Sequence, residues 1–269
     1  MAIPKMKLND GTEIPMLGLG SWNILGKTAE KQLKTALELG YRHFDTAEIY
    51  RNEEEVGKVI ADYPREEIYI VSKVSPEHLS QEGVINACEN SLLRLKTPYI
   101  DLYLIHFPRE YVDWEKTLQA FKELRSQGKI KSFGVSNFLI PDLQKILPIC
   151  KNLKLPLANN QIKIHPYLLP EKLIDYCKAN GISITAYSPL AKGRVAHDKI
   201  LMAIGEKYHK TASQIVLRWL FQKELIVIPK ASSKEHQQEN LEIFDFELLQ
   251  EDVNEIDSLS EAGEEYVYR

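Results

Sequence analysis

Residues 45–53 read Asp45-Thr46-Ala47-Glu48-Ile49-Tyr50-Arg51-Asn52-Glu53, a mostly polar run that starts at the end of a short strand predicted over residues 43–46. Before and after it, apolar strand-like runs alternate with amphipathic helical patterns. Strands are predicted at residues 16–20, 43–46, 68–73, 101–106, 132–137, 157–162, 183–188 and 226–229, and helices at 28–39, 81–95, 114–127, 141–147, 171–179 and 213–222. Because parallel strands need a crossover connection, usually a helix, this alternation indicates a parallel sheet. Eight such units predict one α/β domain over residues 1–269, a (β/α)8 TIM barrel.

Two segments lie outside this repeat. Residues 5–14 alternate around Asp10-Gly11, a pair typical of a type I′ turn, and so predict a β-hairpin flap that closes the bottom of the barrel. The long interval after residue 188 predicts a loop or an extra helix over the rim. Residues 247–258 predict a last helix, which is followed by a short aromatic end, Tyr266-Val267-Tyr268.

Composition narrows the class of protein. The chain is 44% hydrophobic and 27% charged, which is ordinary for a globular protein with a sizeable core. Its formal net charge of −4, without a basic stripe, argues against nucleic acid as a partner. No apolar run approaches the roughly 20 residues that span a bilayer, and the first residues lack the apolar core of a signal peptide. Three widely spaced cysteines, Cys88, Cys150 and Cys177, fit reduced thiols in a cytoplasmic protein. The net charge and the lack of an obvious apolar surface pattern make a monomer the expected state.

Four residues of complementary chemistry fall at predicted strand ends. Asp45 ends the second strand and Tyr50 follows it, while Lys73 ends the third strand and His106 the fourth. In a (β/α)8 barrel these ends share the functional rim. A phenol has an ordinary pKa near 10, and a neighbouring cation would lower it. The pattern therefore predicts a Tyr50 general acid, tuned by a Lys73–Asp45 pair, with His106 orienting a carbonyl oxygen.

Each of these residues alone has a plainer interpretation. A single tyrosine after a strand usually packs, and a single lysine–aspartate pair is more often structural than catalytic. Only the four together, at successive strand ends, favour catalysis. Metal binding is not predicted, because the seven histidines show no paired ligand spacing and no Cys-x-x-Cys occurs.

The other half of the predicted rim suits a nucleotide cofactor. Ser136-Asn137 and Asn160-Gln161 end two strands and could bind an amide such as a nicotinamide carboxamide. Tyr187 could stack on a flat ring. Lys230 and Ser232 follow the last strand, where barrels often hold phosphate. No Gly-x-Gly-x-x-Gly follows a strand, so a Rossmann site is not predicted.

These segments together resemble the aldo-keto reductases along essentially the whole chain, in the form of a prokaryotic-type member with a short tail. The matching segments are Gly18-Leu19-Gly20-Ser21-Trp22, residues 44–53, residues 99–106, Gly134-Val135-Ser136-Asn137-Phe138, Asn160-Gln161, Ala186-Tyr187-Ser188-Pro189-Leu190 and Ile228-Pro229-Lys230. The resemblance implies reduction of aldehydes and ketones by hydride transfer from NADPH, bound in extended form. It implies Tyr50 as the acid, Lys73 and Asp45 as its tuning pair, and Trp22, Tyr50 and His106 around the substrate, a small carbonyl compound.

The resemblance also implies a set of cofactor-binding residues: Gly20, Ser21, Trp22, Asp45, Ser136, Asn137, Gln161, Tyr187, Ser188, Leu190, Ile228, Lys230, Ala231, Ser232, His236, Glu239 and Asn240. Two of them depart from the pattern of NADPH-preferring members, which usually carry serine or threonine at the position of Ala231 and arginine at that of His236. Both groups commonly contact the 2′-phosphate. NADPH is therefore the expected cofactor, with NADH as a secondary one.

Two other functions use the same fold. Rim lysines such as Lys73, Lys163 and Lys230 could form an imine with a carbonyl substrate, as in a Schiff-base aldolase. A regulatory subunit could bind a nucleotide without turnover. The residue set Asp45, Tyr50 and His106 argues against both. The short C-terminal end implies an open pocket, so no narrow substrate is predicted.

Overall fold

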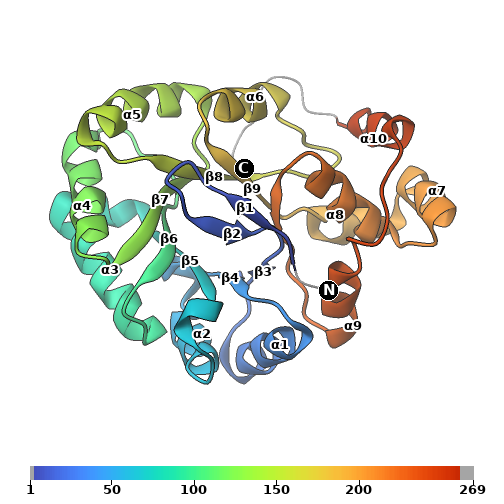
Figure 1. Ribbon diagram of the computed structural model, residues 1–269, viewed down its shortest axis with the longest axis horizontal. Coiled ribbons are helices and arrows are strands. Elements are labelled where there is room, and N and C mark those ends of the chain that lie inside the picture. The colour runs from blue at the N-terminus through green and yellow to red at the C-terminus, as the bar shows by residue number, and fades with distance from the viewer. Residues whose placement is uncertain (1–2, 261–269) are drawn as a thin grey trace.

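Eight parallel strands follow one another in chain order around a ring, with helices outside them (Figure 1). The structure is a computed structural model and describes residues 3–260. The strands are β3 (Leu19–Gly20), β4 (His43–Asp45), β5 (Tyr69–Val74), β6 (Ile100–Ile105), β7 (Ile130–Ser136), β8 (Leu157–Lys163), β9 (Ser183–Tyr187) and β10 (Ile226–Ile228). The helices are α1 (Gly26–Leu39), α2 (Glu53–Ile60), α3 (Gln81–Leu95), α4 (Trp114–Ser126), α5 (Ile140–Leu153), α6 (Glu171–Ala179), α7 (Lys199–Tyr208), α8 (Ala212–Gln222), α9 (Lys234–Leu241) and α10 (Gln250–Asp257).

The first and last strands meet and close the ring. Leu17 forms a parallel bridge with Val227. The Gly18 amide donates to the Val227 carbonyl at 2.9 Å, and the Val227 amide donates to the Met16 carbonyl at 2.9 Å. Every strand therefore has a neighbour on both sides, which removes the exposed edges of an open sheet. The predicted (β/α)8 barrel is confirmed.

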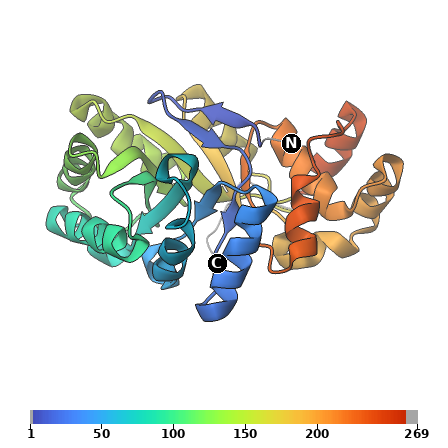
Figure 2. The ribbon, with the colours of Figure 1, turned by 60° about the horizontal axis from the view of Figure 1, so that its bottom comes forward.

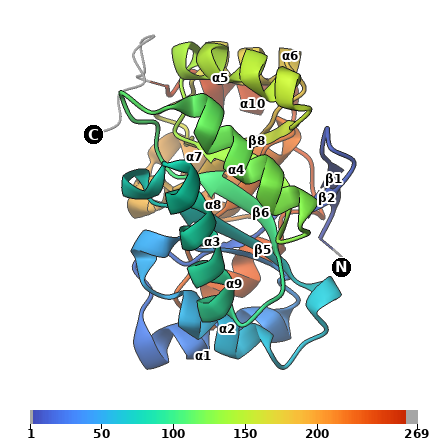
Figure 3. The same ribbon diagram turned by 90° about the vertical axis from the view of Figure 1, so that its left-hand side faces the viewer.

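Helices cover the outside of the barrel, and α1 to α5 stand next to one another in Figure 3. The loop or extra helix predicted after residue 188 is a 3₁₀ segment, η4 (Ala191–His197), followed by α7, and α8 is the helix predicted at residues 213–222. The last predicted helix is confirmed as α10, whereas the aromatic end lies outside the described residues. Helix α5 continues past Pro148, where the prediction stopped, because its apolar face runs on to Cys150.

The hairpin consists of β1 (Lys5–Lys7) and β2 (Glu13–Pro15). Its predicted type I′ turn is wrong. That turn needs positive φ at two central residues, and in this loop only Gly11 has one, at 90°. The loop instead spans Leu8 to Thr12, and Oδ1 of Asp10 accepts hydrogen bonds from the Thr12 amide at 3.1 Å and its hydroxyl at 2.7 Å. The aspartate side chain thus stabilises a wider turn.

The hairpin closes one end of the barrel, as predicted, and lies across that end in Figures 1 and 2. Leu8 and Ile14 are buried in a cluster with residues from the early parts of the strands: Tyr69, Val71, Leu102, Leu104, Ala158 and Ile226. The Asn9 side-chain amide donates to the Leu157 carbonyl at 2.8 Å. The candidate site lies at the opposite end of the barrel, at the carboxyl ends of the strands.

Two other features bear on the expectations from composition. All three cysteines are unpaired and buried, as predicted. None of the helices in residues 3–260 is both long enough and apolar enough to cross a membrane.

Candidate active site

The four predicted catalytic residues lie together at the carboxyl ends of neighbouring strands. Asp45 ends β4, and Tyr50 ends the 3₁₀ turn η1 (Glu48–Tyr50) that follows it. Lys73 lies near the end of β5, and His106 comes directly after β6. Lys73 Nζ donates to Asp45 Oδ1 at 2.6 Å and lies 4.9 Å from the centre of the Tyr50 ring. The Tyr50 and His106 rings meet edge to face, with centroids 5.6 Å apart.

The Lys73–Asp45 pair is buried, and both side chains make further hydrogen bonds. Lys73 is 0% exposed, and it also donates to the Thr46 carbonyl at 2.9 Å. The second carboxylate oxygen of Asp45 accepts from the Gln161 amide at 2.7 Å. Burial lowers the pKa of Lys73, while the adjacent Asp45 charge opposes that fall. The pair therefore holds opposite charges in place at the base of the site.

The expected net fall in the pKa of Tyr50 is not found in this structure. Burial raises the pKa of the Tyr50 phenol well above its usual value, and the nearby Asp45 and Tyr187 act in the same direction. The physical reason is that burial disfavours the charged phenolate, and the negative charge of Asp45 adds to that effect. Tyr50 therefore keeps its proton at neutral pH.

His106 is held neutral by its surroundings. It is 5% exposed, and burial, with a smaller contribution from the Lys73 charge, lowers its pKa to about 2. Its ring stacks on that of Phe107, with centroids 4.8 Å apart and an interplanar angle of 12°. Its Nδ1 is buried and has no hydrogen-bond partner among the described residues. A neutral imidazole can donate one hydrogen bond without bringing a charge into the site.

Residues that the sequence reasoning did not assign hold the Tyr50 turn in place. The Asn52 side-chain amide donates to the carbonyls of Ser21 at 2.8 Å and Ile24 at 2.9 Å, and its oxygen accepts from the Thr46 hydroxyl at 2.7 Å. The only signal in the sequence was an asparagine just before a helix, which usually indicates a cap. Here the side chain makes no cap bond and instead ties the segment after β4 to the loop after β3.

Glu53 is the second residue that was missed. It is buried at the start of α2, accepts from the Ser72 hydroxyl at 2.5 Å and pairs with Arg94 at 2.7 Å. Its partners come from β5 and α3, so the pairing could not be read from local sequence. It ties the helix that follows Tyr50 to the strand that carries Lys73.

A cavity of about 310 Å³ opens above the four residues. Most of its lining was predicted: Gly20, Trp22, Asp45, Tyr50, His106, Ser136, Asn137, Gln161, Tyr187, Ser188, Ile228 and Lys230. Ile49, Phe107 and Lys192 were not, and Lys163 was named only as a rim lysine for the aldolase alternative. Trp22 is 57% exposed and Ile49 46% exposed, so the mouth of the cavity carries apolar surface.

The Asn137 side chain in the cavity wall is hydrogen-bonded to neighbouring residues. The Asn137 side-chain amide donates to the His106 carbonyl at 2.9 Å, and its oxygen accepts from the Tyr187 hydroxyl at 2.8 Å. Asn137 has a positive φ of 64°, which asparagine tolerates better than most residues. These contacts fix one wall of the cavity.

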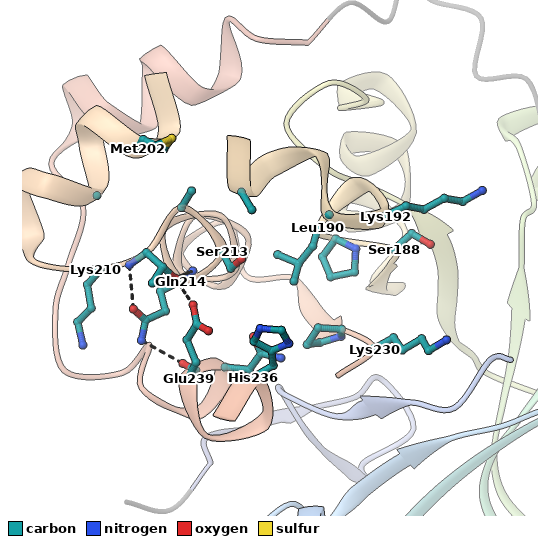
Figure 4. Close-up of a pocket in the computed structure, with 18 of the residues that line it drawn as sticks. Ser188, Leu190, Lys192, Met202, Lys210, Ser213, Gln214, Lys230, His236 and Glu239 are labelled. Atoms are coloured by element: carbon teal, nitrogen blue, oxygen red, sulfur yellow. Dashed lines mark hydrogen bonds between the residues drawn. The ribbon is translucent and has the colours of Figure 1, made fainter. Parts of the chain in front are cut away.

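A larger cavity of about 1240 Å³ adjoins the first (Figure 4). Trp22, Ser188, Lys192 and Lys230 line both, so the two form one continuous groove. The larger part also holds the predicted residues Leu190, His236, Glu239 and Asn240. Figure 4 shows Lys192 and Lys230 on one side of it, with Met202 and Lys210 on the far side.

Three predicted cofactor residues do not line either cavity. Ser21 is buried, and its hydroxyl donates to the Asp45 carbonyl at 2.8 Å. Ala231 is also buried, and its carbonyl accepts from the Gln237 side chain at 3.1 Å. Ser232 is exposed just before α9. In residues 3–260, no group of three or more histidine, cysteine or acidic side chains is arranged to hold a metal ion.

Comparisons with known proteins agree with this geometry. The profile of the Aldo/keto reductase family matches residues 16–261. The glyoxal reductase of Bacillus subtilis is 43% identical over 259 residues, covering 95% of this chain and 92% of that protein. Methylglyoxal reductase DkgB of Salmonella typhi is 40% identical, covering 91% and 93%. The crystal structure of MGS-M4, an aldo-keto reductase from a deep-sea metagenome library, superposes with a TM-score of 0.92 at 39% identity, covering 99% and 97%. This chain belongs to the aldo/keto reductase family.

Proposed function

We propose that this protein reduces aldehydes and ketones to alcohols with NADPH, and that Tyr50 delivers the proton. The observation that carries this proposal is the 310 Å³ cavity, because Tyr50 and His106 both line it above the buried Lys73–Asp45 pair. The relatives named above are reductases of glyoxal and methylglyoxal. We therefore propose small 2-oxoaldehydes as the first substrate class.

The bound nicotinamide cofactor supplies the hydride that reaches the carbonyl carbon. Tyr50 holds the proton, because its raised pKa keeps the phenol neutral. As charge grows on the carbonyl oxygen, Tyr50 donates that proton and becomes a phenolate. Lys73, 4.9 Å from the ring, stabilises the phenolate until a proton from solvent restores it.

Neutral His106 orients the substrate oxygen. Because its Nδ1 has no acceptor among the described residues, its proton is better placed on Nε2. That N–H gives the carbonyl oxygen a second donor beside the Tyr50 hydroxyl. Two donors aimed at one oxygen stabilise the charge that develops there.

The groove fits an extended dinucleotide. Tyr187 and Ser136-Asn137 border the cavity beside Tyr50, where a nicotinamide would bind. Lys192 and Lys230 line the part shared by the two cavities and would face the diphosphate. Glu239 and Asn240 line the larger cavity and would lie beside the adenine base. Lys230 and His236 would contact a 2′-phosphate, which supports NADPH, with NADH as a secondary cofactor.

An aldolase is the weaker candidate. Lys73 is fully buried, bonded to Asp45, and absent from the described lining of the cavity, so it could not reach a substrate carbon. Lys163 and Lys230 do line the cavity. Trapping a substrate adduct with borohydride would reveal an imine on either lysine.

A panel of glyoxal, methylglyoxal, aromatic aldehydes and simple ketones, run with NADPH and with NADH, tests the proposal. We expect cofactor oxidation that depends on the carbonyl compound. Cofactor binding without any turnover would indicate the regulatory function instead. Size-exclusion chromatography of the same preparation tests the monomer that we propose.

A further inference from the structure

A polar network lies outside the cavity and joins the three segments that follow β4, β5 and β6. Tyr50 and His106 lie in the first and last of these segments, and Lys73 lies near the end of β5. We call this network the rim clamp, and it consists of Glu48, Ser75, Glu77, His78 and Arg109. Glu48 opens the η1 turn, and Ser75, Glu77 and His78 follow β5. Arg109 lies three residues after His106. None of the five lines the described cavities, so the proposed chemistry does not use them.

Glu48 stands at the centre of the rim clamp. One carboxylate oxygen accepts from the Ser75 amide at 2.9 Å, and the other lies 2.9 Å from His78 Nδ1. The Glu48 side chain is only 17% exposed, whereas His78 is 49% exposed. A carboxylate that accepts a backbone hydrogen bond away from bulk water makes a strong, directional contact. The contact with Ser75 is therefore the anchoring one, and His78 covers it from the solvent side.

This anchor couples Tyr50 to Lys73. Glu48 precedes Tyr50 by two residues, and Ser75 follows Lys73 by two. Inside the turn, the Tyr50 amide donates to the Ala47 carbonyl at 3.0 Å. On its other flank the turn is tied down by Asn52, which bonds to the loop after β3. Glu48 thus links the turn itself, residues 48–50, to the segment directly after the Lys73 strand, while Thr46 and Glu53 hold the residues on either side of the turn.

The rim clamp continues towards His106. The Ser75 hydroxyl donates to the Glu77 carboxylate, whose other oxygen pairs with Arg109 at 2.5 Å. Arg109 and Glu77 are both more than half exposed, so this outer pair contributes little energy on its own. Its place, on the loop that follows His106, shows that the network spans all three segments.

We propose that Glu48 is a positioning residue that holds the Tyr50 hydroxyl in register with Lys73 and the substrate oxygen. This inference rests on the proposed carbonyl reduction. Because Glu48 lies at the edge of the barrel, its loss leaves the core packed. The residues on either side of the turn, Thr46 and Glu53, keep their bonds to β5, but the turn itself loses its side-chain tie to the loop after β5, and the phenol moves relative to the Lys73 strand. Misplacing a catalytic group by about 1 Å can reduce the rate by about 10².

The test is a single-turnover measurement, which reports hydride transfer even where cofactor release limits kcat. Enzyme preloaded with NADPH is mixed with methylglyoxal. We expect Glu48→Ala to slow transfer by about 10- to 100-fold. NADPH affinity, measured by fluorescence titration, should stay within about twofold. Glu48→Gln keeps an acceptor for the Ser75 amide and should recover most of the rate, while Glu54→Ala, an exposed glutamate in α2, is the matched control.

A second pair of variants removes the donor instead of the acceptor. Ser75 has φ −63°, which proline also adopts, so Ser75→Pro deletes the N–H that Glu48 accepts without forcing a new backbone angle. Ser75→Ala removes only the hydroxyl. We expect slow hydride transfer in Ser75→Pro and near-normal hydride transfer in Ser75→Ala. Thermal unfolding followed by circular dichroism gives the folded fraction of each variant, to which the rates are normalised.

The outcomes are distinct. Wild-type transfer rates per folded molecule in both Glu48→Ala and Ser75→Pro, beside an inactive Tyr50→Phe, would overturn this inference alone. Failure of the wild type to reduce any carbonyl compound would remove the proposed function and this inference with it. Equal loss in Glu48→Ala and Glu48→Gln, with NADPH affinity lost as well, would show a structural role.

Discussion

At the scale of single residues, the site separates the group that holds the proton from the groups that hold charge. Tyr50 is kept protonated by burial, and His106 is kept neutral by burial, with a pKa near 2. Lys73 and Asp45 hold opposite charges 2.6 Å apart. On the protein, the only net change during the proposed reaction is therefore that Tyr50 becomes a phenolate beside a cation already in place, while the nicotinamide would gain the balancing positive charge as it gives up the hydride.

The first prediction concerns the proton donor. Tyr50→Phe keeps the ring and its contact with His106 but removes the hydroxyl. We expect kcat for carbonyl reduction to fall by at least about 10², because general acid catalysis contributes about 10²–10⁴. NADPH affinity by fluorescence titration should be nearly unchanged. Carbonyl reduction close to the wild-type rate would remove Tyr50 from the mechanism.

The second prediction separates the stabilising and catalytic roles of the buried pair. Lys73→Met leaves the Asp45 carboxylate buried without its cation, which should cost about 3–5 kcal/mol in the free energy of unfolding. The double variant Lys73→Met/Asp45→Asn removes both charges and should recover much of that stability. We expect both variants to be inactive in the reductase assay.

Urea unfolding of the single and double variants measures the stability. A double variant that is stable and also active would show that the pair serves only the fold.

At the scale of elements, the cofactor groove is built by segments that follow the last two strands. The η4 segment after β9 supplies Lys192, the segment between β10 and α9 supplies Lys230, and the first turn of α9 supplies His236. Ala231 is buried between the last two and can offer no hydroxyl to a phosphate. We therefore expect cofactor choice to depend on Lys230 and His236 rather than on a hydroxyl at position 231.

The third prediction follows from this arrangement. Arginine is charged at all relevant pH values and can bind two phosphate oxygens at once. His236→Arg should tighten NADPH binding by about 1–3 kcal/mol if a new charged hydrogen bond forms. NADH lacks the 2′-phosphate, so its affinity should stay the same. Fluorescence titration of both cofactors measures the difference, and an equal effect on both would show that residue 236 does not face the phosphate.

At the scale of the whole molecule, closing the barrel buries groups that titrate freely in an unfolded chain. His43, in β4, is 0% exposed, its Nδ1 lies 2.9 Å from the Pro15 carbonyl, and its pKa is lowered to about 4. His165 is lowered to about 4 and His106 to about 2, in each case mainly by burial. All three are neutral in the folded protein at pH values where the unfolded chain binds protons.

The fourth prediction follows with a definite sign. Because the folded pKa values lie below the ordinary 6.5, the unfolded state binds more protons as pH falls, so stability is full above about pH 6.5 and is lost towards pH 4. His43 alone contributes up to about 3 kcal/mol of this loss. His43→Gln cannot be protonated and should flatten the pH dependence, whereas the exposed His197→Gln should not. Urea unfolding at pH 7 and pH 4.5 measures the free energy of unfolding at each pH. An equal loss of stability between the two pH values in both variants would contradict the prediction.

Local sequence was sufficient for much of the architecture. Strand and helix periodicity is a property of neighbouring residues, so the eight strands and the last helix could be predicted. Helix α5 was cut short at Pro148 because a proline usually ends a helix. Here the buried contacts of Cys150 keep the helix going. The hairpin was predicted, but its turn type was not. The Asp10 side chain accepts from the Thr12 amide, and the Asp10-Gly11 pair alone does not indicate that contact.

By itself the sequence determined which four residues meet at the rim, because strand ends in a parallel barrel share one face whatever the detail of the loops. Only the tertiary structure decided how they behave. Gln161 bonds to Asp45 across 116 positions of the chain, Tyr187 comes from β9 to raise the pKa of Tyr50, and Glu48 reaches Ser75 across the gap between two loops. Burial and electrostatic surroundings depend on atoms brought together from the whole chain, and a local pattern carries no record of them.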